Sequence, residues 1–127
     1  MTFPEFLQEL QKLKKEEQRA QEPDYLEVVI ASEALEPLGK ALAAYFGPPL
    51  KPAGSAPSGE ATQRAAPYGG IRKDQTMYFR QDGDLEECAF LWPWGSGARI
   101  TVKVIRAKQA DLKSGWDGFL ENLFGRK

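Results

Sequence analysis

The chain has 127 residues, a length that suits one domain with a single hydrophobic core. Apolar residues make up 42% and charged residues 28%, and the net charge of −1 gives no overall attraction to nucleic acid or to an anionic membrane. The sequence contains no histidine, which excludes mechanisms that need a histidine base or a histidine metal ligand.

Charge is distributed unevenly along the chain, and the cysteine content indicates the cellular compartment. Residues 1–36 carry four Lys/Arg against nine Asp/Glu, a net of −5, whereas residues 37–127 carry thirteen against nine, a net of +4. The single cysteine, Cys88, allows no disulfide within the chain, which fits a reducing compartment. We find no pattern of a secretory signal and no run of 18 apolar residues, so we expect a cytoplasmic protein that does not enter a membrane.

A helix is predicted at the start of the chain, where Thr2 and Glu5 have the spacing of a capping box. Residues 14–22 are almost wholly charged or amide, so they either extend this helix into solvent or fray, and Pro23 ends it. The helix either covers the domain or is shared with a partner or a second subunit. Its apolar residues recur at spacings of three and four, on one face: Phe3, Phe6, Leu7, Leu10 and Leu13.

Residues 24–31 fit two structures, because their apolar residues match both a buried strand and one face of a helix. We favour a strand, since the run is short, rich in β-branched residues and bounded by Pro23 and Ser32. Residues 32–46 predict a second helix that Ser32 caps and Gly47 ends. Its inward face is expected to hold Leu35, Leu38, Leu42, Tyr45 and Phe46.

Residues 47–70 contain five glycines and five prolines among 24 residues, with no periodic apolar pattern. Such a composition predicts a long irregular loop. A loop of this length within a domain is expected to be either disordered or a functional lid.

Residues 69–107 predict a three-stranded antiparallel meander. The Asp82-Gly83 pair is typical of a type I′ turn, and the middle strand is apolar on both faces, as at the centre of a sheet. In the last strand Thr101 and Lys103 are expected to point outward, with Ile105 as an apolar exception on that face. The three strands are expected at 75–80, 87–92 and 100–106.

A final helix is predicted over residues 111–124, with apolar residues at helical spacing and Gly125 after its end. The fold class is therefore α+β: a single domain over 1–127, in which a four-stranded, largely antiparallel sheet has its helices packed on one face.

The most suggestive local feature is Trp92-Pro93-Trp94, which holds two large aromatic surfaces at a strand end. We weigh three roles for it: core packing, with Trp94 covering the edge of the core; a protein interface; or a platform for a small molecule or nucleotide. A single-stranded nucleic acid needs aromatic residues interleaved with cations, and the acidic first third makes nucleic acid an unlikely partner. The candidate residues for a ligand or an interface are Trp92, Trp94, Tyr78, Arg72, Lys73, Arg99 and Lys103.

Other polar groups give weaker indications of chemistry. Asp82, Asp84, Glu86 and Glu87 gather at one turn, where carboxylates more often serve solubility and backbone bonding than catalysis. Cys88 is expected to face the core. The sequence shows no phosphate-loop, dinucleotide or EF-hand spacing. We therefore expect no catalytic residue, no metal site and no cofactor.

The function we expect is a small, non-catalytic binding or protein-interaction module, which pairs with a protein partner or with itself as a homodimer. The alternative is a binding protein for a small anionic ligand, or a weak enzyme, with residues 47–70 as the lid and Arg72, Lys73 or Arg99 facing the anion.

Overall fold

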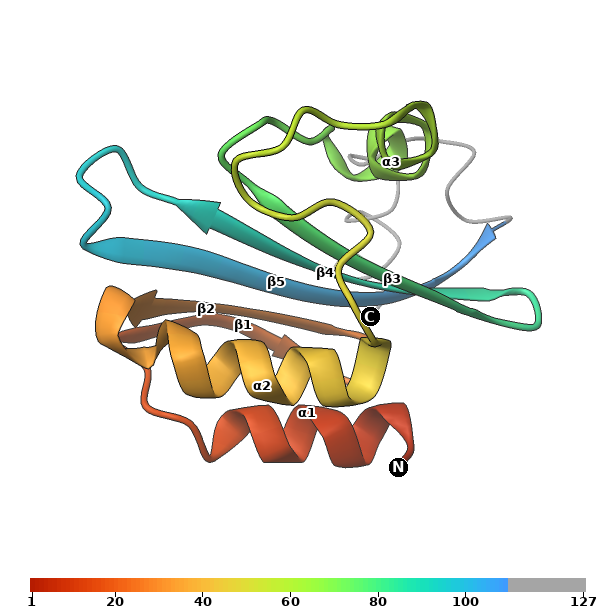
Figure 1. Ribbon diagram of the computed structural model, residues 1–127. Coiled ribbons are helices and arrows are strands. Elements are labelled where there is room, and N and C mark those ends of the chain that lie inside the picture. The colour runs from red at the N-terminus through yellow and green to blue at the C-terminus, as the bar shows by residue number, and fades with distance from the viewer. Residues whose placement is uncertain (110–127) are drawn as a thin grey trace.

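A computed structural model describes residues 1–109 of the chain (Figure 1). It is an α+β fold built on one antiparallel sheet, in the order β1-β2-β5-β4-β3, which confirms the predicted class. The strands are β1 (Glu17–Glu22), β2 (Tyr25–Ala31), β3 (Thr76–Asp82), β4 (Leu85–Pro93) and β5 (Arg99–Lys108). The helices are α1 (Phe3–Gln11), α2 (Leu35–Phe46) and α3 (Gly59–Ala65), with short 3-10 turns η1 (Ser32–Ala34) and η2 (Ala66–Tyr68).

The sheet has five strands where the sequence predicts four, because residues 17–22 form a strand and not the end of a helix. The capping box at Thr2 is present as predicted, but α1 stops at Gln11. The chain then turns, and the amide of Glu16 donates to the carbonyl of Val29, 2.8 Å away. β1 is an outer strand and mostly exposed, so it has no apolar alternation by which a strand is recognised in a sequence.

The helices lie on both faces of the sheet, which corrects the expectation of a single covered face (Figure 1). On one face, here called the α1/α2 face, Phe6, Leu10 and Leu42 pack with strand residues such as Leu26 and Val104. On the other, the α3 face, the core consists of Tyr25, Ala65, Tyr68, Met77, Cys88, Phe90, Ile105 and Ala107. The apolar Ile105, on the face predicted to point outward, is therefore a core residue of a second layer.

Helix α2 ends where predicted, but it begins at Leu35 and not at Ser32. Residues 32–34 form η1, and the predicted cap by the Ser32 side chain is wrong, because no side chain caps either element. Pro37 lies in the first turn, where its missing amide hydrogen costs no bond, and Gly47 ends the helix with a φ of +82°. Leu38 and Leu42 are buried, but Leu35, predicted to face inward, is 38% exposed. Leu35 is the first residue of α2, at the end of the helix.

The segment 47–70 is not one irregular loop, because it contains α3 and η2. The hydroxyl of Ser58 accepts from the amide of Ala61, 3.1 Å away, and caps α3. Ala61 and Ala65 are fully buried, and the guanidinium of Arg64 lies 4.2 Å from the centre of the Phe79 ring on β3. Small side chains let this helix approach the sheet closely, and alanines give a weak apolar signal in the sequence.

Lys51 connects the first part of segment 47–70 to the sheet through a β-bridge and hydrogen bonds. Its backbone forms a bridge with Met77, and its Nζ donates to the carbonyl of Lys73 and to that of Gln75, the latter at 2.5 Å. The residue is 1% exposed, and burial lowers the pKa of its ammonium group.

Replacing Lys51 with methionine should lower the free energy of unfolding by about 2 kcal/mol, because the Gln75 carbonyl loses a charged donor. Urea unfolding followed by circular dichroism measures this change. Lys73→Met is the matched control: Lys73 contributes its carbonyl and its side chain is exposed, so we expect a change below about 0.5 kcal/mol. Equal losses in both variants would contradict a role for the buried ammonium group.

Two further predictions concern the β3–β4 turn and the end of the chain. The β3–β4 turn has Gly83 and Asp84 at its centre, and Gly83 alone of the two has a positive φ, so the predicted type I′ turn is wrong. The helix predicted over 111–124 lies outside the described residues. Within residues 1–109 no helix combines the length and the apolar character that crossing a membrane requires.

Candidate functional site

Trp94 lies just past the end of β4, at the hairpin that leads into β5. Its amide donates to the carbonyl of Arg99 at 2.9 Å, and the Gly97 amide donates to the Trp94 carbonyl at 2.8 Å. The indole Nε1 donates to the hydroxyl of Thr101, 2.9 Å away. The side chain is nevertheless 38% exposed. Trp94 is thus a large aromatic group that is fixed in place and still accessible.

A β-bulge in β1 brings a cation to this tryptophan. Gln18 pairs with Val28 and Ala20 with Glu27, so Arg19 is an extra residue without a partner on β2. Bulges turn a side chain away from the regular alternation of a strand. The Arg19 guanidinium consequently lies on the α3 face, 5.8 Å from the centre of the Trp94 ring.

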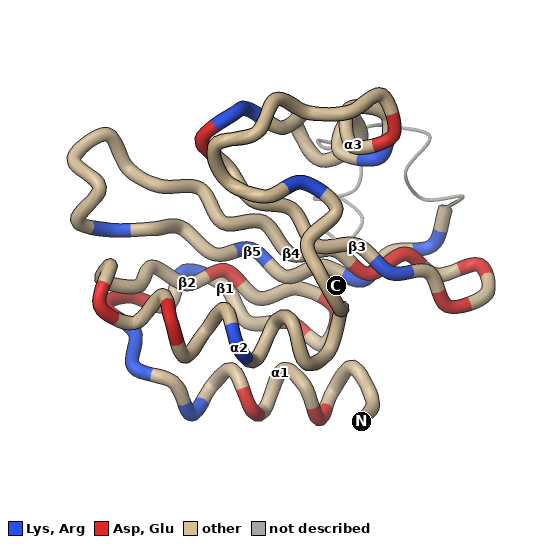
Figure 2. The backbone as a smooth tube through the Cα atoms, viewed as in Figure 1, with Lys and Arg blue, Asp and Glu red and all other residues tan. Residues whose placement is uncertain are grey.

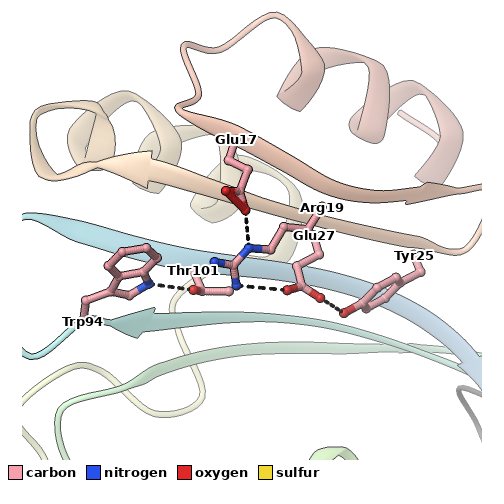
Figure 3. Close-up of polar contacts among 6 residues, drawn as sticks. All are labelled: Glu17, Arg19, Tyr25, Glu27, Trp94 and Thr101. Carbon is pink, nitrogen blue, oxygen red and sulfur yellow. Dashed lines mark hydrogen bonds and ion pairs between the residues drawn. The ribbon is translucent and has the colours of Figure 1, made fainter.

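Two carboxylates hold Arg19 in this position (Figure 3). Its Nε donates to Glu17 at 2.5 Å, and a terminal nitrogen lies 3.7 Å from Glu27. The hydroxyl of Tyr25 donates to the other oxygen of Glu27 at 2.5 Å. The Glu17 side chain is 54% exposed and that of Glu27 only 19%, so Glu17 is the carboxylate that an incoming group meets first.

Two more cations lie on the same face of the sheet. The Arg99 guanidinium lies 6.0 Å from the centre of the Trp94 ring, and the Lys103 ammonium 4.0 Å from that of the Trp92 ring. Burial lowers the pKa of Lys103. Among the residues that the structure describes, Arg99 forms no ion pair. We call the exposed group formed by Glu17, Arg19, Trp94 and Arg99 the Trp94 surface.

The structure gathers four of the seven predicted candidates, because Trp92, Trp94, Arg99 and Lys103 all lie on the α3 face. Trp92 is partly buried in the α3-face core, and its Nε1 is buried without a hydrogen-bond partner in the described part of the chain. Cation–π contacts of this kind contribute about 0.5–1 kcal/mol each where they are exposed. These contacts restrain Trp94 more than they stabilise the fold.

The other three candidates lie elsewhere. The expectation that Tyr78 shares a face with Lys103 is wrong. Tyr78 pairs with Ala89 and lies in the core of the α1/α2 face, 6% exposed. Arg72 and Lys73 are exposed in the segment before β3. No described contact joins their side chains to either tryptophan.

The acidic residues near the β3–β4 turn divide between the two faces. Asp82 and Asp84 are exposed, whereas Glu86 and Glu87 are buried. Glu86 accepts from the Tyr68 hydroxyl at 3.3 Å, on the α3 face. Glu87 accepts from the Tyr45 hydroxyl at 2.6 Å and lies 3.4 Å from the Nε of Arg80, on the α1/α2 face. Each buried carboxylate thus has donors, and the two do not form a pair.

The groups described here differ in the chemistry that they can support. Cys88 is fully buried, as predicted, and burial raises the pKa of its thiol to about 12, so the nucleophilic thiolate is scarce near neutral pH. Within the described range, 1–109, His, Cys, Asp and Glu side chains form no group of three or more that could hold a metal ion. The Trp94 surface offers an aromatic ring, two guanidinium groups and one exposed carboxylate.

The sequence does not indicate Arg19 and Glu17 as site residues, because residues 14–22 predict an exposed extension of the first helix or its frayed end. A single arginine among acidic and amide residues carries no signal of its own. Only the strand pairing, with its extra residue, brings Arg19 to Trp94.

Both signs of charge are spread over the elements of the fold, and the tip of the β3–β4 hairpin is acidic (Figure 2). Compared with protein-family models, curated proteins and solved structures, the chain matches none.

Proposed function

We propose that this protein is a non-catalytic protein-interaction module that forms a homodimer through the Trp94 surface. The observation that carries the proposal is the state of Trp94, which is accessible, anchored by Thr101 and flanked by two arginines. Tryptophan and arginine dominate the energetic centres of protein interfaces. A side chain that is already restrained loses little conformational entropy on binding.

A second copy of the chain is the partner because the Trp94 surface carries both signs of charge. An interface between two identical subunits related by a two-fold axis brings one surface against itself. Such a surface is self-complementary only if cations on one subunit can meet anions on the other. Arg99 and Glu17, both exposed and on the same sheet face, meet this condition.

Replacing Trp94 with alanine should weaken the dimer about 30-fold or more, the effect of removing an interface centre worth about 2 kcal/mol. Native mass spectrometry across a concentration series, on gently purified protein, measures the dimer fraction. Leu35→Ala is the matched control, because Leu35 is also 38% exposed but lies on α2, away from this face. We expect it to change the dissociation constant less than threefold.

Two results would reject this function. A wild-type protein that stays monomeric at tens of micromolar has no dimer to explain. A dimer that Trp94→Ala leaves unchanged uses another surface. Circular dichroism of the variant distinguishes a genuine loss of the dimer from a failure to fold.

The alternative function, an anionic-ligand site under a lid at 47–70, has less support from the geometry. Four residues spread along this segment are buried: Lys51, Ala61, Ala65 and Tyr68. Their burial holds most of the segment against the sheet. A retained small molecule would appear in the same native mass spectrum as added mass on the monomer, and would favour this alternative.

A further inference from the structure

We infer that, in the proposed homodimer, Arg99 of each subunit pairs with Glu17 of the other. This inference rests on the proposed function and specifies which contact sets the orientation of the two subunits. It names a reciprocal ion pair, repeated by the two-fold axis.

Glu17 and Arg99 lie on the two strands that flank β2. Glu17 pairs with Val29 on β2, and Arg99 pairs with Ala31 on the other edge of the same strand. β1 and β5 are therefore separated by β2, about 10 Å across the sheet, and the two positions differ by two residues, about 7 Å along it. Both residues lie on the α3 face with Trp94.

The symmetry of a homodimer makes an ion pair between Glu17 and Arg99 reciprocal. A two-fold axis through the region between Glu17 and Arg99 exchanges their positions in the partner subunit. Arg99 then meets the carboxylate of the other subunit while Glu17 meets its guanidinium, and the two Trp94 surfaces come together near the axis. Residue pairs in a two-fold interface always occur twice in this way.

Within one subunit, the charged side chains of the Trp94 surface differ in whether they have an ionic partner. Arg19 is neutralised by Glu17 and Glu27, and the latter also accepts from Tyr25. Arg99 lies beside an aromatic ring, and the described residues provide it with no carboxylate. Glu17 bonds Arg19 through one oxygen, and the other oxygen of this half-exposed side chain can accept from a second guanidinium.

A charge reversal tests the pair. Arg99→Glu should weaken the dimer at least tenfold, since one substitution places like charges together at two symmetric contacts. Glu17→Arg should weaken it by a similar factor. The double variant, Arg99→Glu with Glu17→Arg, should return the dissociation constant to within about threefold of wild type, because the pair is re-formed with its signs exchanged. Sedimentation equilibrium at low salt measures all three.

The controls separate this inference from its alternatives. Lys40→Glu makes the same change of charge at an exposed position on α2, on the opposite face of the sheet, and should leave the dimer within about threefold of wild type. Glu17→Arg also disturbs Arg19 within one subunit, and Arg99→Glu places a carboxylate beside the same Trp94 ring as Arg19. An equimolar mixture of the two single variants separates these effects, because its heterodimer re-forms both ion pairs while neither subunit carries both changes. Recovery of the dimer in this mixture therefore reports a contact between subunits.

Absence of rescue, with each single variant still weakening the dimer, would overturn the Arg99–Glu17 pairing and leave the Trp94 interface standing. A dimer that responds to neither reversal would also overturn the pairing. A dimer that Trp94→Ala does not affect rejects the proposed function itself, so the two failures are distinguishable.

Discussion

Replacing Phe6 with alanine should lower the free energy of unfolding by about 4 kcal/mol, the largest loss we expect from one substitution in this fold. Phe6 is fully buried between α1, α2 and the sheet. Its ring stacks on that of Tyr45, with 4.2 Å between centres and 5° between planes, and meets the Phe46 ring edge-on at 5.6 Å. Truncation opens a cavity where α1 is attached.

Urea unfolding followed by circular dichroism measures this loss. Phe79→Ala is the control, since it makes the same change on the α3 face at a partly exposed position, and we expect a loss of about 1–2 kcal/mol there. Equal midpoints for wild type and Phe6→Ala would mean that α1 contributes little to the stability of the sheet.

The second large effect is a loss of stability at alkaline pH. Burial raises the pKa of Cys88 from 9.0 to about 12 and raises the pKa values of Tyr25, Tyr45 and Tyr68 above 10.0. The folded state therefore binds these protons more tightly than the unfolded state does. Their contribution is fully present below pH 9 and is lost as the pH rises.

Each such group removes about 1.4 kcal/mol per pH unit between its unfolded and folded pKa values. Cys88 alone should lower the free energy of unfolding by about 3 kcal/mol between pH 9 and 11, and the tyrosines add to this above pH 10. Lys51 and Lys103 have the opposite effect on the free energy of unfolding, because burial lowers their pKa values. Their contribution stops changing above pH 10.5, the pKa of an unperturbed lysine.

Urea midpoints at pH 8, 9, 10 and 11 measure the alkaline loss, and Cys88→Ala provides the control. That variant starts from a lower stability because it loses packing, but its stability should fall less steeply between pH 9 and 10. A midpoint in the wild type that stays constant from pH 8 to 11 would contradict the tight burial of Cys88 and the three tyrosines.

The sequence predicts those elements whose ends and periodicity are determined by residues close together in the chain. The capping box of α1, the end of α2 at Gly47 and the three strands of the meander all follow from local patterns. The apolar middle strand indicates a central position in the sheet, and in the structure its two faces and Ile105 belong to cores on both sides of the sheet. We placed all helices on one face because α3 consists largely of small and polar residues and has no recognisable stripe.

The candidate site is predictable only in part, for a related reason. Trp92, Trp94, Arg99 and Lys103 belong to one hairpin, so alternation along two strands is enough to place them on one face. Arg19 and Glu17 come from a strand about 75 residues earlier, and only long-range pairing brings them there. Tyr78 was misplaced because we assigned it to a face shared with Lys103, whereas the register pairs Lys103 with Phe90 and Tyr78 with Ala89.

The bulge at Arg19 has a consequence for how β1 tolerates changes in length. Deleting Arg19 would make the ladder with β2 regular without shifting Ala20 or the residues after it. The same deletion would remove the guanidinium from Trp94 and leave Glu17 without its partner. A continuous ladder and a complete Trp94 surface are thus mutually exclusive in β1: the interruption of the strand is the condition for the surface.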